Sequence, residues 1–170
     1  LAGSIPASLA QTTYERILAR LEGRDIRAVV DATRDLLVNV LRYKPFLIKP
    51  NNHELSEIAG VKLTNDNEIV TAARMMQAKG ARNVLVSMAG DGALLLDEQG
   101  GVHRIGCPKG KVVNSVGAGD SMVAGFVAGY QQSGGDYAAA LKLGTACGSA
   151  TAFSLGLATK ADIDKLLKTM

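Results

Sequence analysis

A glycine-rich turn followed by an acid stands out between residues 113 and 121. The segment reads Val-Asn-Ser-Val-Gly-Ala-Gly-Asp-Ser, and a stretch without charge follows it. Such a turn can direct several backbone N–H groups at one point, where the start of a helix adds partial positive charge. Asp120 would then stand beside a bound anion, in position to accept a proton. A cradle for negative charge beside a base is what transfer of a phosphoryl group to an alcohol requires.

The same residues have an alternative interpretation, an ordinary strand-to-helix turn with an aspartate cap, because short glycine motifs have many false positives. The flanks favour the anion site. Residues 110–113 predict a short strand before the turn. After the turn, small residues recur at helical spacing: Ala124, Gly125, Ala128 and Gly129. Because glycine is a poor helix former, we expect a buried, closely packed helix whose N-terminus lies at the site.

The elements that must position this motif alternate along the chain. Periodicity predicts helices at about 14–21, 35–41, 52–59, 65–79, 118–132, 136–153 and 161–168. Apolar runs predict strands at 26–31, 46–49, 83–87, 93–97 and 102–105, the last two joined as a hairpin. This alternation predicts an α/β fold with a mostly parallel sheet and helices on both faces. Ligands of such sheets collect at the carboxyl ends of the strands.

A second motif, Lys-Pro-Asn-Asn-His-Glu at 49–54, follows a predicted strand directly. Asn51 and Glu54 face the same way if the segment turns helically, and Glu54 could hold Mg²⁺ through water. The alternative is a plain helix start, with Asn51 as the cap and Glu54 at the third position. Spacing alone favours the helix start. His53 lies between these positions, and we expect it to be exposed.

Three further segments could contact a ligand. Residues 87–92 form a glycine-containing loop after a strand, where the backbone could approach a ligand, although Asp-Gly is also a common turn pair. Ser4 follows the opening strand and could equally be a cap or a loop hydroxyl. The small residues at 145–149, Gly148 among them, could make room for an adenine ring, and tight helix packing explains them as well.

Composition excludes several classes of function. Lysine and arginine total 19 against 16 acids, and aromatic residues make up only 4%, so nucleic-acid binding is not expected. Cys107 and Cys147 are the only cysteines, too few for a metal site or a disulfide framework, and they favour a reducing cytoplasm. Cys147 is expected to be a buried free thiol. Residues 143–159 carry no charge but are shorter than a membrane span, so we expect a core helix and its exit.

Residues 114–126, Asn-Ser-Val-Gly-Ala-Gly-Asp-Ser-Met-Val-Ala-Gly-Phe, resemble the second signature of the PfkB (ribokinase-like) carbohydrate kinases. The resemblance implies that Asp120 is the catalytic base and contacts the substrate, and that Gly117, Ala118 and Gly119 form the anion hole. Many family members have Asp where this chain has Asn114. The Asn form is similar to the phosphosugar branch, 1-phosphofructokinase and tagatose-6-phosphate kinase.

The other segments are also similar to family motifs. Residues 49–55 are similar to the family's Lys-Pro-Asn-x-x-Glu-Leu, and this likeness reverses the preference for a plain helix start. It implies that Asn51 and Glu54 organise Mg²⁺ and phosphate and that Lys49 and Asn51 approach the nucleotide phosphates. Ser4 would approach the phosphosugar. The family's nucleotide loop is usually Ser-x-Gly-x-x-Gly, and Ala89 departs from it. The resemblance implies that ATP contacts the following residues: Ser87, Met88, Ala89, Gly90, Asp91, Gly92, Gly119 and Gly148.

Taken as a member of this family, the chain is expected to have a ribokinase-like (Rossmann-like) α/β/α sandwich. We expect residues 1–170 to be a single domain, the nucleotide-binding C-terminal portion of the kinase, with the N-terminal portion and its lid outside this chain. The expected reaction uses ATP and Mg²⁺ to convert fructose 1-phosphate to fructose 1,6-bisphosphate. The alternatives are a tagatose-6-phosphate kinase and a non-catalytic nucleotide-binding fragment. We expect the protein to be cytoplasmic, and a homodimer is a possible assembly. Its expected partners are ATP and a phosphosugar, not nucleic acid or membrane.

Overall fold

The computed structural model of the protein describes residues 1–170. Two compact units divide the chain. The first holds residues 1–87 and 95–102, and the second holds residues 88–94 and 103–170. The expectation of a single domain stays a prediction.

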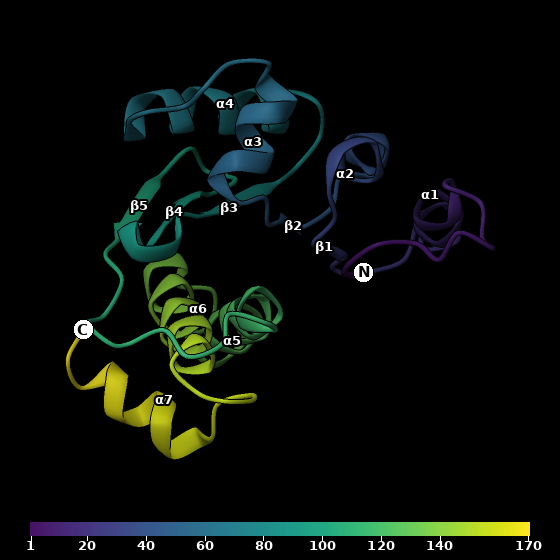
Figure 1. The fold of residues 1–170 in the computed structure, drawn as a ribbon. Coiled ribbons are helices and arrows are strands. Elements are labelled where there is room, and N and C mark those ends of the chain that lie inside the picture. Colours follow the sequence, from purple (N-terminus) through teal and green to yellow (C-terminus); the bar gives the residue numbers. More distant parts are fainter. The chain divides into compact units, whose positions relative to one another are not determined.

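The first unit alternates helices with short strands. Its helices are α1 (Thr13–Ala19), α2 (Arg34–Val40), the 3₁₀ turn η1 (Leu41–Tyr43), α3 (Asn52–Ala59) and α4 (Asp66–Ala78). Its strands are β1 (Val29–Val30), β2 (Leu47–Ile48) and β3 (Asn83–Ser87) (Figure 1). One face of α4 is apolar and buried through Ile69, Ala73 and Met76, whereas Val70 is only partly buried.

The sheet contains five strands in the order β1-β2-β3-β4-β5, where β4 is Ala93–Leu96 and β5 is Val102–Ile105. Strands β1, β2 and β3 are parallel, with Val30 opposite Ile48 and Ile48 opposite Val84. A turn at residues 97–101 joins β4 to β5, closed by a 2.9 Å hydrogen bond from Asp97 N–H to the Gly101 carbonyl. These features confirm the predicted α/β fold with a mostly parallel sheet.

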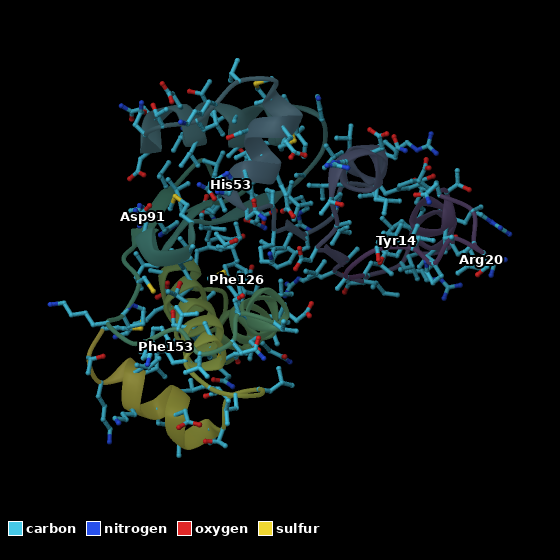
Figure 2. All side chains as sticks on the ribbon, in the orientation of Figure 1. Tyr14, Arg20, His53, Asp91, Phe126 and Phe153 are labelled. Atoms are coloured by element: carbon cyan, nitrogen blue, oxygen red, sulfur yellow. The ribbon has the colours of Figure 1, made fainter.

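The second unit is built on a pair of helices. It contains the 3₁₀ turn η2 (Ala89–Asp91), α5 (Ala118–Gln132), α6 (Tyr137–Ala152) and α7 (Lys160–Leu167). Helices α5 and α6 lie side by side (Figure 1), and Phe126 of α5 is fully buried (Figure 2). A Cβ atom built on Gly125 would lie 2.7 Å from the Cys147 sulfur, so glycine permits this close approach. The expected glycine packing is therefore confirmed.

Two of the predicted strands need correction. Residues 110–113 do not form a strand: the N–H groups of Val113 and Asn114 donate to the Ala152 carbonyl, at the end of α6, and Val112 and Val113 are exposed. The strand expected at 26–31 shrinks to Val29–Val30, because the preceding segment is exposed and turns locally.

Helix α5 is buried on one face only. Met122, Gly125, Phe126 and Gly129 are buried, whereas Val127 is 39% exposed. The lack of charge in this helix therefore does not mean burial on every side. Each helix of the protein is too short or too polar to span a lipid bilayer.

Candidate active site

The carboxyl ends of the parallel strands in the first unit bring several predicted site residues to one end of the sheet. Asp31 follows β1 and forms a parallel bridge with Ala2, two residues before Ser4. Asn51 follows β2 and forms a parallel bridge with Ser87, the last residue of β3. This strand alignment gathers residues far apart in sequence, at the place where α/β sheets bind ligands.

Lys49 is buried beside an acid that the sequence did not mark as functional. Its ammonium nitrogen lies 3.2 Å from an Asp31 carboxylate oxygen, and the two side chains are only 7% and 18% exposed. Because Val30 lies opposite Ile48 across parallel strands, Asp31 and Lys49 occupy the next register position. The sequence shows Asp31 only as an acid at the end of a strand, and the strand register is needed to pair it with Lys49.

Asn51 and Glu54 form a capping box at the start of α3. The Asn51 side-chain oxygen accepts hydrogen bonds from His53 N–H and Glu54 N–H, both at 2.9 Å. Glu54 Oε2 accepts one from Asn51 N–H at 2.8 Å. The helix-start interpretation of this motif is thus confirmed, and His53 is exposed as expected (Figure 2). The roles of Asn51 toward phosphate and of Glu54 toward Mg²⁺ stay predictions.

Glu54 nevertheless fits the part expected of it toward Mg²⁺. Its second carboxylate oxygen makes no hydrogen bond, and the side chain is half-buried. No group of three or more His, Cys, Asp or Glu side chains that could enclose a metal ion is found. Mg²⁺ at nucleotide sites needs only one or two carboxylates, because phosphates and water supply the remaining ligands.

The loop after β3 lies in the second unit from Met88 onward. It closes through hydrogen bonds from Met88 N–H to the Gly92 carbonyl and from Asp91 N–H to the Met88 carbonyl, at 2.8 and 2.9 Å. Ala89 has φ +47°, in the left-handed region, where a residue with a Cβ atom is destabilised by about 1–2 kcal/mol. Glycine would adopt this backbone conformation without that cost. Gly90 and Asp91 are exposed, and Figure 2 labels Asp91.

Gly117 begins α5 without a side-chain cap. Its φ is +80°, and the Ala118 N–H donates to the Ser115 carbonyl at 3.2 Å. The backbone N–H groups of Gly117, Gly119 and Asp120 make no hydrogen bond within the protein. The Asp120 side chain is exposed and takes part in no ion pair or hydrogen bond. Unpaired donors beside an unpaired carboxylate can hold an anion and accept a proton.

The exit of α6 supports this turn through contacts that the sequence did not predict. The Asn114 side chain accepts from Val116 N–H at 3.0 Å and donates to the Leu155 carbonyl at 3.2 Å. The Thr151 hydroxyl lies 2.9 Å from the Ser121 hydroxyl and accepts from Ala158 N–H. Thr151 is 30 positions from Ser121, and Leu155 is 41 positions from Asn114, so these two contacts cannot be predicted from local spacing.

Gly148 packs under the first turn of α5. A Cβ atom built there would lie 3.0 Å from the Ala118 carbonyl oxygen and 3.1 Å from the Met122 Cβ. This geometry favours tight packing as the reason for the small residue, and its contact with ATP stays a prediction. Cys147, one position earlier, is a free thiol, half-buried rather than fully buried, and burial raises its pKa.

A family model matches residues 1–164 of this chain, that of the pfkB family carbohydrate kinases. The chain belongs to this family. It is 47% identical over 167 residues to the 1-phosphofructokinase of Bacillus subtilis, covering 98% of this chain and 54% of that protein. It is 36% identical over 170 residues to the D-tagatose-1-phosphate kinase of Bacillus licheniformis, covering 99% and 54%. The chain therefore spans about half the length of the curated relatives it matches.

Solved structures of this family share the fold. A Staphylococcus aureus protein described as a phosphofructokinase superposes with a TM-score of 0.92 at 40% identity, covering 98% of this chain and 54% of that one. Arabidopsis thaliana ribokinase superposes with a TM-score of 0.81 at 20% identity, covering 95% and 54%. The second likeness concerns the fold alone, and together they confirm the ribokinase-like fold expected from the sequence.

Proposed function

We propose that the protein acts in ATP-dependent phosphoryl transfer to a sugar phosphate, with fructose 1-phosphate as acceptor and fructose 1,6-bisphosphate as product. The observation that carries this proposal is the start of α5, where three unpaired N–H groups accompany the unpaired carboxylate of Asp120. The 47% identity to a 1-phosphofructokinase supports the choice of acceptor.

In this reaction Asp120 accepts the proton of the sugar hydroxyl as its oxygen approaches the γ-phosphorus. The transition state of such transfers is loose, so the proton leaves late and a strong base is unnecessary. The unpaired N–H groups of Gly117, Gly119 and Asp120 would stabilise the charge of the transferring group, whereas the N–H of Ala118, which the family motif also places in the anion hole, already donates to the Ser115 carbonyl. Because these donors are in place before the reaction, little reorganisation energy is needed when the phosphoryl group is transferred.

The first unit supplies the groups expected to face the nucleotide. Lys49 and Asn51 stand at the strand ends and would bind phosphate oxygens, and Ser4 would approach the phosphosugar. Mg²⁺, held through Glu54 and water, would neutralise polyphosphate charge when it is bound. Ser87 of the first unit would contact ATP, and so would residues 88–92, which belong to the second unit. Each of these assignments follows from the family motifs.

Tagatose phosphates are the second candidate acceptors. The relative at 36% identity is named D-tagatose-1-phosphate kinase, and the sequence resemblance also extends to tagatose-6-phosphate kinase. A nucleotide-binding protein without catalysis is the candidate from another class. Nothing in the arrangement of α5 distinguishes sugars, so kinetics must separate these possibilities.

Two measurements test the proposal. Calorimetry with ATP and Mg²⁺ tests nucleotide binding, and a coupled ADP assay compares fructose 1-phosphate, tagatose 1-phosphate and tagatose 6-phosphate. The assay uses two preparations. One is this chain alone, and the other is this chain mixed with a second polypeptide, the part of the related kinases that this chain does not cover. We expect ATP binding, with turnover greatest on fructose 1-phosphate. Preference for a tagatose phosphate would replace the acceptor, and tight ATP binding without turnover in either preparation would favour the non-catalytic alternative.

We also propose that the protein is cytoplasmic and forms a homodimer. A solved neighbour at 28% identity, phosphofructokinase-2 of Escherichia coli, is described as tetrameric in its inhibited form, which supports self-association. Sedimentation equilibrium with and without ATP measures the assembly, and a monomer at all concentrations would contradict a homodimer.

A further inference from the structure

The loop before α5 has little apolar contact to hold it in place. Val112, Val113 and Val116 are 63%, 49% and 78% exposed. Leu155, on the segment that faces this loop, is 87% exposed. Burial stabilises a side chain in proportion to the apolar area removed from water, so these residues contribute little to the position of the loop. Hydrogen bonds must fix it instead.

Four hydrogen bonds perform this task, and Asn114 takes part in three of them. Its side-chain oxygen accepts from Val116 N–H, and its side-chain nitrogen donates to the Leu155 carbonyl. Its own N–H donates to the Ala152 carbonyl at 3.1 Å, beside the bond from Val113 N–H at 2.8 Å. One residue thus closes the turn that leads into Gly117 and also ties that turn to the exit of α6.

We propose that Asn114 is a positioning residue that sets the direction of the Gly117–Asp120 amides for phosphate. It touches no reacting atom in this role. It acts by holding the N–H of Val116, the residue directly before Gly117, whose left-handed backbone leads into the helix. The inference rests on the proposed function, because it assigns Asn114 to the anion site of that reaction.

The amide group suits both bonds, and a carboxylate does not. The side-chain N–H₂ of asparagine donates while its oxygen accepts, whereas an ionised aspartate only accepts. Asn114→Asp therefore keeps the bond from Val116 and loses the bond to Leu155, leaving two oxygens facing each other. Asn114→Ala loses both side-chain bonds. Both variants keep the backbone bond to Ala152.

The test measures ATP affinity by calorimetry and amide exchange by NMR in the wild-type chain and both variants. A lost hydrogen bond changes equilibria by about two- to tenfold, so Asn114→Ala is expected to weaken ATP binding by about tenfold and Asn114→Asp by less. Exchange at Val113 and Ala118 is expected to accelerate in the same order. The matched control is Asn65→Ala, because Asn65 makes the same kind of side-chain bond where it caps α4. That control should lose stability without change in ATP affinity.

These outcomes distinguish failure of the positioning role of Asn114 from failure of the proposed function. If the wild-type chain binds ATP and folded Asn114→Ala binds it equally well, the positioning role is wrong and the proposed function stands. If Asn114→Ala weakens binding no more than Asn65→Ala does, the effect is general destabilisation and the role is also wrong. If the wild-type chain does not bind ATP, the proposed function fails. Unchanged exchange at Val113 and Ala118 would then remove the positioning role as well.

Discussion

The starts of α3 and α5 carry an acid at the same helical position but use it differently. Glu54 and Asp120 are each the third residue of their helix. At α3, Glu54 turns back to the Asn51 N–H, and the Asn51 side chain takes up two more donors. At α5, Gly117 offers no side chain and Asp120 bonds to nothing in the protein. The start of α3 thus uses its acid and its cap within the protein, whereas the start of α5 leaves three N–H groups and its acid unpaired.

The largest effect is expected from Asp120→Asn, which removes the base but keeps the shape of the open helix start. Turnover on the preferred sugar phosphate should fall by a factor of at least about 100, because positioned general bases contribute about that much. ATP affinity should stay unchanged, since the amides that hold phosphate remain. The coupled ADP assay and calorimetry measure the two quantities. Near-normal turnover with unchanged ATP binding would show that Asp120 is not the base.

Giving α5 a side chain at its start should make it resemble α3. Gly117→Asn places an amide beside the free N–H groups, where it competes with an anion, and its Cβ would lie 3.0 Å from Leu157. Asparagine tolerates the left-handed backbone, so the fold should persist while ATP affinity falls by about tenfold.

The matched control for that variant is Gly134→Asn. Gly134 has φ +71° and open space around its Cβ position, so the same change costs backbone energy without approaching the amides. Calorimetry should show wild-type ATP affinity for this control. Equal loss of affinity in both variants would show that the open start of α5 is not the phosphate site.

Glu54→Gln tests whether the acid of α3 does more than cap. Glutamine can serve at the third position of a capping box, so thermal stability should change little. The charge is lost, and the Mg²⁺ concentration for half-maximal turnover should rise several-fold if this carboxylate organises the ion. The control is Glu68→Gln, at the third position of α4, which should leave the Mg²⁺ requirement unchanged. A similar Mg²⁺ requirement in both variants would show that Glu54 only caps the helix and does not organise the ion.

The smallest effect concerns Asp162, the acid at the third position of α7. Hydrogen bonds from the Thr159 hydroxyl and backbone N–H lower the pKa of this carboxyl group. A lowered pKa stabilises the fold above the unfolded-state pKa, and this stability is lost as pH falls through the folded-state pKa. NMR titration should show a higher Asp162 pKa in Thr159→Ala than in the wild type. An identical pKa in the two proteins would contradict the capping assignment.

Local pattern was enough to predict most of the fold. Helices α3 and α5 and strands β3 and β5 begin and end at the predicted residues, because apolar periodicity and capping residues act over a few positions. The glycine-rich turn and the Lys-Pro-Asn motif can likewise be recognised from a few adjacent residues. The segment at 110–113 was misread because two valines favour a strand, whereas the end of α6 supplies the partner for its N–H groups.

Contacts between distant residues could not be predicted in the same way. The pairing of Lys49 with Asp31 depends on strand register, which the spacing of 18 residues does not specify. The bond from Asn114 to Leu155 spans 41 residues and joins a turn to a helix exit. A sequence shows which side chains could bond, and the packing of helices and strands decides which of them meet.

The glycine of α6 that lies against the Ala118 carbonyl has a consequence for anyone who wishes to redesign this protein. One methyl group at Gly148 would press on the turn that carries the amides, although that position need not touch any substrate. Substitutions at the contact between α5 and α6 would therefore disturb the start of α5 without touching any residue of the proposed site. Variant libraries that keep the residues of the α5–α6 contact unchanged should therefore contain a larger share of correctly folded proteins.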